Sequence, residues 1–429
     1  MSGSYVTQRV ISEGSLQLLL AAGEAGEVNS GFRAVSRASF GSGSSTETVQ
    51  VPEHLMSASA LVFCGFDATV ADQIFNKWVE NEENYDEETQ FEPEDLITLA
   101  RHYVKTVSRT TEAWLPDPIH SWDGVLQAQG ISENTRARIL HPDYRELRLT
   151  GTASYWALDT IDLCWEFLED LDGRIIQKKQ ESARVASPDP NIQPSAALRP
   201  TLRPTLTQAI HGPRPIYSLL TEAIPPSQVD GCMILYKGGS YERFLSVFRP
   251  DGTLNLEPIL SRPPTDFHPA YPLLYFTKHI EVAQKYASYV ALRIPPEEAG
   301  IMYVAVPREI MEGQRSVYHP DWRDIIWHSR NRHAYTANAG RLPPSLRTYE
   351  QAPVLVGDIC GQATSRVSRM SDQSQLEPLR LRSGGRATQV VFQSPEMISV
   401  GFAREVQGRL WVSSTRAPDV CRYVPRQEE

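Results

Sequence analysis

The sequence predicts an α+β protein built from two modules, a mostly helical one followed by one with more strand than helix. Three observations lead to this fold class. Apolar residues recur at helical spacing between residues 53 and 180, the segment 181–215 holds seven prolines and few apolar residues, and short β-rich runs bounded by Gly, Pro or polar turns follow from residue 216 to 424. A length of 429 residues also suits two or three domains.

Two stretches of the chain have compositions that are typical of unpacked segments. Residues 1–52 contain Ser and Gly in quantity, and residues 36–48 are too polar to bury a core, so we expect a flexible N-terminal arm. The Pro-rich segment 181–215 should form an extended linker. The predicted parts are therefore an arm (1–52), a helical module (53–180), a linker (181–215) and an α+β module (216–424).

Three helices are predicted in the first module. One follows Asp67 as N-cap, a second begins at Pro93, and the third covers residues 155–171. On the third helix, Asp159, Asp162 and Glu166 lie largely away from the apolar face. Acids at such spacing can converge on a cation, but a solvated outer face of a helical bundle has the same pattern, and we favour that interpretation.

The second module contains five β-rich runs and two helical ones. The expected strands cover residues 233–236, 273–277, 301–306, 354–359 and 388–393. The expected helices cover residues 279–292 and 321–329. This alternation indicates an α+β module.

Charge and cysteine usage limit the possible compartments and cofactors. Residues 1–180 hold 14 Lys and Arg against 28 Asp and Glu, whereas the remainder holds 28 against 24. The five cysteines are far apart and form no Cys-x-x-Cys pair, which favours a reducing, cytoplasmic location and gives no sign of a metal site. No apolar run approaches the roughly 20 residues that span a bilayer, so no membrane contact is expected.

Three strand-borne fragments remain once common catalytic motifs have been sought and not found. The first is Leu-Tyr-Lys-Gly-Gly-Ser at 235–240, a strand that runs into glycines where a backbone can approach a ligand closely. The second is Leu-Tyr-Phe-Thr at 274–277, which leads at once into a helix. The third is the alternating strand that begins Thr-Gln-Val-Val-Phe at 388. The candidate site residues on these fragments are Tyr236, Lys237, Gly238, Ser240, Tyr275, Thr277 and Gln389.

In order and spacing, the fragments resemble the three motifs of the ADP-ribosyltransferase fold. Ala283, Tyr286 and Ala287 match the helix after the second motif, and residues 322–332 resemble a helix found between the second and third motifs of bacterial and fungal members. The resemblance implies two small sheets with NAD in the cleft between them. It also implies transfer of ADP-ribose to an acceptor, protein or small molecule, that the sequence does not identify.

The resemblance gives each candidate catalytic residue a role. Lys237 stands where the family usually has His and would donate to the ribose, and Tyr275 would stack on the nicotinamide. Gln389 occupies the position of the family's Glu, which holds the nicotinamide ribose while positive charge builds on its anomeric carbon. The cofactor-binding residues would be Tyr236, Gly238, Ser240 and Thr277. Because Gln carries no charge, it would stabilise that transition state less than a carboxylate.

Two other hypotheses stay open. The first module resembles uncharacterised filamentous-fungal proteins, some from secondary-metabolite gene clusters, and more distantly the arginine-containing cyclodipeptide synthases, which use aminoacyl-tRNA. That family is associated with adjacent aspartates, and this chain has no Asp-Asp pair; Asp159, Asp162 and Glu166 are the nearest approximation. An arginine-rich stretch at 366–386 could follow the tRNA phosphates. The third hypothesis is a binding module without catalysis.

Overall fold

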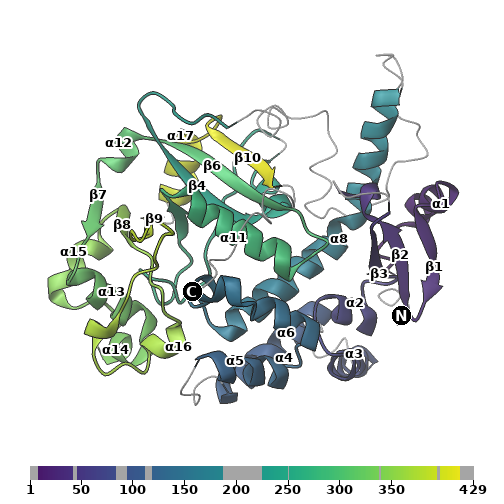
Figure 1. Cartoon of the computed structure of the whole chain (residues 1–429), viewed down its shortest axis with the longest axis horizontal. Coiled ribbons are helices and arrows are strands. Elements are labelled where there is room, and N and C mark those ends of the chain that lie inside the picture. The colour runs from purple at the N-terminus through teal and green to yellow at the C-terminus, as the bar shows by residue number, and fades with distance from the viewer. Residues whose placement is uncertain are drawn as a thin grey trace, which may run out of the picture. The chain divides into compact units, whose positions relative to one another are not determined.

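The computed structural model describes residues 8–41, 46–83, 94–111, 118–186, 225–249, 251–337, 340–393 and 397–415 (Figure 1). The chain forms two compact units. Unit 1 comprises Met1–Ile139 and Ala153–Gln208, and unit 2 comprises Leu140–Thr152 and Ala209–Glu429. The helical and the mixed regions expected from the sequence are both present, but segment 140–152, expected in the helical module, belongs to unit 2. Most of the expected linker, from residue 187 onward, lies outside the described residues.

The N-terminal region corrects the expectation of a flexible arm, because its described residues form a helix and a sheet. These elements are α1 (Glu13–Ala21), β1 (Ala25–Asn29), β2 (Phe32–Ser36) and β3 (Thr48–Pro52), and the antiparallel sheet has the order β1-β2-β3. Ser30 and Gly31 both have positive φ, which suits a two-residue hairpin turn between β1 and β2. The sheet buries Val35 and Val51. A few buried apolar residues are thus sufficient for a sheet to form in a segment of polar composition.

The rest of unit 1 is helical, as predicted. Its main helices are α2 (Ala58–Phe63), α3 (Ala68–Glu83), α4 (Leu96–Thr111), α5 (Pro118–Ala128), α6 (Glu133–Ile139) and α8 (Ala153–Ala186). Asp67 accepts a hydrogen bond from the backbone of Thr69 at the start of α3, whereas α4 begins after Asp95, whose carboxylate accepts from Thr98. Helix α8 packs against α4 and α5.

One acid of α8, Asp162, does not lie on the solvated face that the sequence suggested. Asp162 is 0% exposed, and its Oδ1 lies 2.6 Å from Nε of Arg101 on α4. A buried carboxylate needs such a partner, because an isolated charge is strongly disfavoured away from water. This aspartate therefore joins two helices of unit 1.

Unit 2 is built on a seven-stranded sheet. Its strands are β4 (Cys232–Ser240), β5 (Leu274–Thr277), β6 (Ala299–Pro307), β7 (Gln314–Val317), β8 (Val354–Asp358), β9 (Thr388–Phe392) and β10 (Leu410–Thr415). The order is β10-β6-β4-β5-β9-β8-β7, and only β7 and β8 pair in parallel among neighbours in this sheet. All five predicted strands are confirmed. Strands β7 and β10 were not predicted: β7 contains a single apolar residue, Val317, and the apolar run of β10 is limited to its first three residues.

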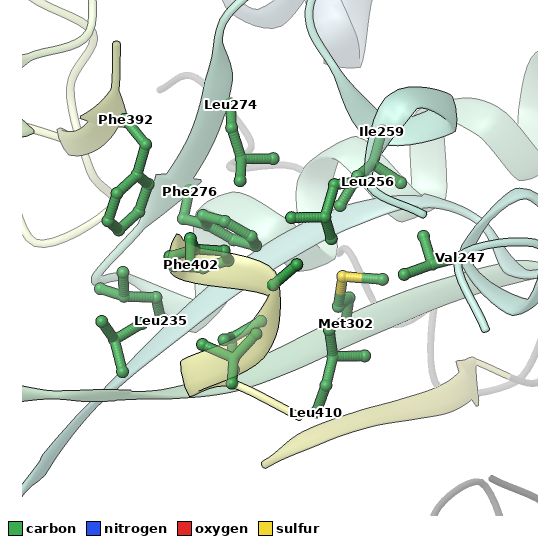
Figure 2. Packing of buried hydrophobic residues seen from close by; sticks show 14 of the residues in the cluster. Leu235, Val247, Leu256, Ile259, Leu274, Phe276, Met302, Phe392, Phe402 and Leu410 are labelled. Carbon is green, nitrogen blue, oxygen red and sulfur yellow. The ribbon is translucent and has the colours of Figure 1, made fainter. Parts of the chain in front are cut away.

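The two faces of this sheet differ in character. One face packs against a large apolar cluster that includes Leu235, Phe276, Met302 and Phe392 (Figure 2). Because side chains alternate along a strand, the residues between these point to the other face. That other face carries Tyr236, Tyr275, Thr277 and Gln389, so the alternation brings most of the candidate site residues to one side.

The helices of unit 2 are mostly short. They are α7 (Arg145–Arg148), α10 (Tyr241–Leu245), α11 (Ile280–Arg293), α12 (Arg308–Met311), α13 (Asp321–Arg330), α14 (Arg332–Ala337), α15 (Arg347–Glu350), α16 (Thr364–Val367) and α17 (Ala403–Glu405). The two predicted helices are confirmed as α11 and α13. Helix α11 lies against β4 and β6 (Figure 1). No helix among the described residues is both long and apolar enough to cross a membrane.

Candidate functional site at the junction of β4 and β5

The three sequence fragments lie on three consecutive strands of the unit 2 sheet. Gln389 on β9 pairs with Thr277 on β5, and Thr277 pairs with Tyr236 on β4. Residues directly opposite each other on antiparallel strands point to the same face. The pairing therefore aligns one residue from each fragment in a single row across the sheet, and Tyr303 of β6 continues it with its ring 5.4 Å from that of Tyr236.

The sheet is barely continuous between the first two fragments. Strands β4 and β5 share the single pair Tyr236 and Thr277, whereas β4 pairs with β6 along its whole length. The sheet therefore consists of two sub-sheets, β10-β6-β4 and β5-β9-β8-β7, which meet at what we name the β4–β5 junction. Lys237, on the opposite face of β4 from Tyr236, donates from Nζ to the carbonyl oxygen of Tyr275 at 3.2 Å, which gives the junction a second link.

Tyr275 is fixed by its hydroxyl group. The hydroxyl donates to Oγ1 of Thr265 at 2.7 Å and accepts from the backbone N–H of Phe267 at 3.2 Å. Burial raises the pKa of this hydroxyl, and the nearby Asp266 carboxylate raises it further. The phenol is thus neutral at physiological pH. The residue as a whole retains partial exposure, and its hydroxyl anchors the loop that precedes β5.

Gln389 is 5% exposed and makes two hydrogen bonds through its side-chain nitrogen. Nε2 donates to Oδ2 of Asp266 at 2.6 Å and to the backbone carbonyl of Asp358 at 3.0 Å. Gln389 therefore acts as a donor toward a carboxylate. A glutamate here would lose both bonds.

Asp266 forms a buried ion pair. Its Oδ1 lies 2.5 Å from Nη2 of Arg330, and the two side chains are 3% and 4% exposed. Oδ2 also accepts from the backbone N–H of Cys360 at 2.9 Å. Arg330 in turn donates to the carbonyl oxygens of Gln362 and Thr150, at 2.6 and 3.0 Å. These contacts join the loop before β5, the end of α13 and segment 140–152.

The electrostatics of this cluster favour a protonated arginine and an inert thiol. Burial is the largest single effect on Arg330 and lowers its pKa, but Asp266 together with Cys360, Tyr275 and Tyr286 outweighs it, so the pKa is raised. Burial raises the pKa of the Cys360 thiol to about 12. Since the thiolate is the nucleophilic form, Cys360 is not an activated nucleophile at neutral pH.

Three of the predicted cofactor-binding residues have contacts within the protein that explain their identities. A Cβ on Gly238 would lie 1.7 Å from the carbonyl oxygen of Ala283, so the glycine lets α11 approach β4 closely. Ser240 caps α10 and donates to Oε1 of Glu297 at 2.9 Å. Thr277 donates to the carbonyl oxygen of Thr388 at 2.8 Å.

Asp266 and Arg330 are the residues that sequence reasoning missed. Asp266 lies in the loop Pro-Pro-Thr-Asp-Phe-His-Pro, which contains no periodic pattern, and its contact with Gln389 spans 123 positions. Arg330 falls in the helix that the resemblance singled out, but its type alone does not indicate a buried pair. Only the long-range pairing of β5 with β9 reveals the cluster. Among the described residues, no three His, Cys, Asp or Glu side chains are placed to hold a metal ion.

We compared the chain with known protein families, curated proteins and solved structures. No protein-family model, curated protein or solved structure matches the chain.

Proposed function

We propose that unit 2 is an ADP-ribosyltransferase-like module that binds NAD at the β4–β5 junction and transfers ADP-ribose to an acceptor. One observation carries this proposal. The three motif-like fragments occupy consecutive strands and one row, where the sheet divides into two sub-sheets. The resemblance implies two small sheets with the dinucleotide between them, and the divided sheet supports that expectation.

The proposed roles follow from the groups at the junction. The partly exposed rings of Tyr236 and Tyr275 lie on the sheet face that carries Gln389 and can pack against a planar base. Lys237 lies on the opposite face of β4, where its Nζ donates to the carbonyl oxygen of Tyr275 and links the two sub-sheets. In the transfer step, the bond between the nicotinamide nitrogen and the anomeric carbon breaks, and nicotinamide leaves with the electron pair. The acceptor's nucleophilic atom then bonds to that carbon and loses its proton to water. Gln389 would hold the ribose as positive charge develops on it.

A second candidate function, NAD binding without transfer, is favoured by the charge state around Gln389. Gln389 carries no charge, and the adjacent Asp266 carboxylate is already neutralised by Arg330. Neither of these two residues thus supplies the free negative charge that would stabilise an oxocarbenium-like transition state. On this alternative, the module senses or sequesters the dinucleotide.

The tRNA-dependent synthase receives less support. Its nearest acidic residues include Asp162, which is buried and paired with Arg101 in unit 1. A carboxylate in that position holds helices together and is not presented to a substrate. The arginines at 366, 369, 380, 382 and 386 are exposed, but exposure alone does not indicate a nucleic acid.

Titration calorimetry with NAD on the full chain tests the proposal. We expect saturable heat, weakened by Tyr236→Ala, which removes a partly exposed ring from the face of β4 at the junction, and little changed by Arg386→Met, which removes an exposed arginine paired with Asp358. Release of nicotinamide in the presence of NAD then separates transfer from binding alone. An absence of heat, or equal affinity in Tyr236→Ala and Arg386→Met, would contradict binding at the junction.

A further inference from the structure

We infer that Asp266 is a positioning residue that fixes the amide orientation of Gln389 and leaves the carbonyl oxygen Oε1 as the only hydrogen-bonding atom that Gln389 offers to a ligand. The identity of that ligand rests on the proposed function. The contact between Asp266 and Gln389 does not, because it is a property of the folded chain.

The amide orientation follows from the partners of Nε2. A primary amide nitrogen carries two hydrogens, and here they are directed to the Asp266 carboxylate and the Asp358 carbonyl, both of which only accept. The reversed amide would place Oε1 against both acceptors and leave two N–H groups without these partners. The surroundings therefore select one of the two orientations of Gln389.

Two contacts hold the Asp266 carboxylate, and a third holds the residue that follows it. Arg330 pairs with Oδ1, the backbone N–H of Cys360 donates to Oδ2, and the Tyr275 hydroxyl accepts from the neighbouring Phe267 N–H. The loop that carries Asp266 is thus anchored to Tyr275, while the Asp266 carboxylate orients Gln389. A change at Tyr275 would reach Gln389 through this loop.

The fixed amide specifies the chemistry that position 389 can recognise. Oε1 accepts hydrogen bonds and does not donate them, so it suits a hydroxyl or N–H donor, such as the ribose diol of NAD. A glutamate would offer the same acceptor, but its other oxygen would lie about as close to Oδ2 of Asp266 as Nε2 does now, at 2.6 Å. Two carboxylates at that distance cannot both remain ionised without strong repulsion. The glutamine therefore preserves the acceptor and avoids the repulsion.

Thermal unfolding of the full chain tests the pairing without any ligand. Asp266→Asn and Gln389→Glu should each lower Tm by roughly 10 °C, because each leaves a buried charge without its partner or places it against another. The exchanged pair Asp266→Asn/Gln389→Glu restores a donor facing a carboxylate, so its fall in Tm should be clearly smaller than the sum of the falls of the two single variants. Recovery is incomplete because Arg330 loses the carboxylate with which it pairs, and because the Cys360 N–H and the Asp358 carbonyl keep their positions. Asp358→Asn is the matched control, since its side chain pairs with exposed Arg386, and Tm should change by less than about 2 °C.

Ligand discrimination tests the orientation of Oε1. With NAD and an analogue that lacks the 2′-hydroxyl of the nicotinamide ribose as probes, the wild type and Asp358→Asn should prefer NAD by roughly tenfold. Asp266→Asn can turn an N–H group toward Gln389 and thereby weaken the selection of one amide orientation, so the preference should fall, although the Asp358 carbonyl still favours the present orientation. If that variant does not fold, the exchanged pair replaces it: the glutamate at 389 still presents an acceptor, and the preference should persist.

Two results would overturn the inference. One is a fall in Tm for the double variant that equals the sum of the falls of the two single variants. The other is a preference for NAD in folded Asp266→Asn that is as large as in the wild type. A protein that binds neither probe yet shows recovery in the exchanged pair would refute the proposed function and still support Asp266 as the residue that holds Gln389.

Discussion

Each unit of this protein buries an aspartate against an arginine, and the two pairs have different surroundings. In unit 1, Asp162 on α8 meets Arg101 on α4, and Arg101 remains 31% exposed. In unit 2, Asp266 and Arg330 are both almost fully buried. Water can thus solvate one member of the first pair, whereas the second pair depends entirely on the protein.

The partners of the two carboxylates differ as well. Asp162 joins two helices, as a structural ion pair in a helical bundle does. Asp266 joins a loop to Gln389 in the row that crosses the β4–β5 junction. Burying a charge costs free energy at any position. A buried charge beside the candidate site residues therefore indicates a functional site more strongly than one that joins two helices.

The largest expected effect on stability is at the buried pair of Asp266 and Arg330. Arg330→Gln leaves the Asp266 carboxylate buried without its counter-charge, and we expect a loss of about 3–5 kcal/mol in the free energy of unfolding. Arg386→Gln, which removes an exposed arginine from a pair with Asp358, should lose no more than about 1 kcal/mol. Urea unfolding of both variants checks this. Equal losses would mean that burial does not distinguish these pairs.

A substitution in the same sheet tests the steric contribution to stability without changing any charge. Gly238→Ala would place its Cβ 1.7 Å from a backbone oxygen of α11, so we expect a loss of about 3 kcal/mol as the helix is displaced. Gly14→Ala in α1 of unit 1 is the control: nothing lies within 4 Å of its Cβ, and the helix should gain up to about 1 kcal/mol. Thermal unfolding of both variants would show opposite signs.

A smaller effect is expected for the pair in unit 1. Asp162→Asn keeps a hydrogen-bond acceptor near Arg101, and that arginine can turn toward water, so the loss should be about 1–3 kcal/mol. The measurement is the same urea unfolding as for Arg330→Gln. A loss for Asp162→Asn that exceeds the loss for Arg330→Gln would invert the comparison between the two units.

The smallest effect concerns pH. Burial lowers the pKa of His268, with Glu350 partly opposing the shift, and Nδ1 of this ring accepts from the backbone N–H groups of Ala270 and Tyr271. The unfolded chain therefore takes up this proton more readily than the folded chain. Stability from this group is complete above the unfolded pKa of about 6.5 and is lost as pH falls below it.

His268→Asn tests the sign. Asparagine can still accept from the loop and does not titrate, so the fall of Tm between pH 7.5 and 5.5 should become shallower. Burial also lowers the pKa of His279 and His328, so part of the slope should remain. His102→Asn, at a half-exposed position in unit 1, is the control. A slope unchanged by His268→Asn would contradict the assignment.

Local patterns in the sequence were sufficient to predict three of the helices of unit 1 (α3, α4 and α8) and five of the strands of unit 2. They failed where a few apolar residues outweighed a polar composition, as at Val35 and Val51 in the N-terminal sheet. They also failed at Asp162, because helical periodicity does not reveal which side a neighbouring helix will cover. The candidate site was predicted only as far as its strands: Asp266 and Arg330 enter through contacts between distant segments, which no local pattern encodes.

Hydrogen exchange with and without NAD tests the central claim most directly, because it reports where the ligand binds. The proposal predicts slower exchange in β4, β5 and β9, which carry Tyr236, Tyr275 and Gln389, and no change in the helices α2 to α6 of unit 1. Protection confined to other segments, or no protection at saturating NAD, would contradict the assignment of the β4–β5 junction as the binding site.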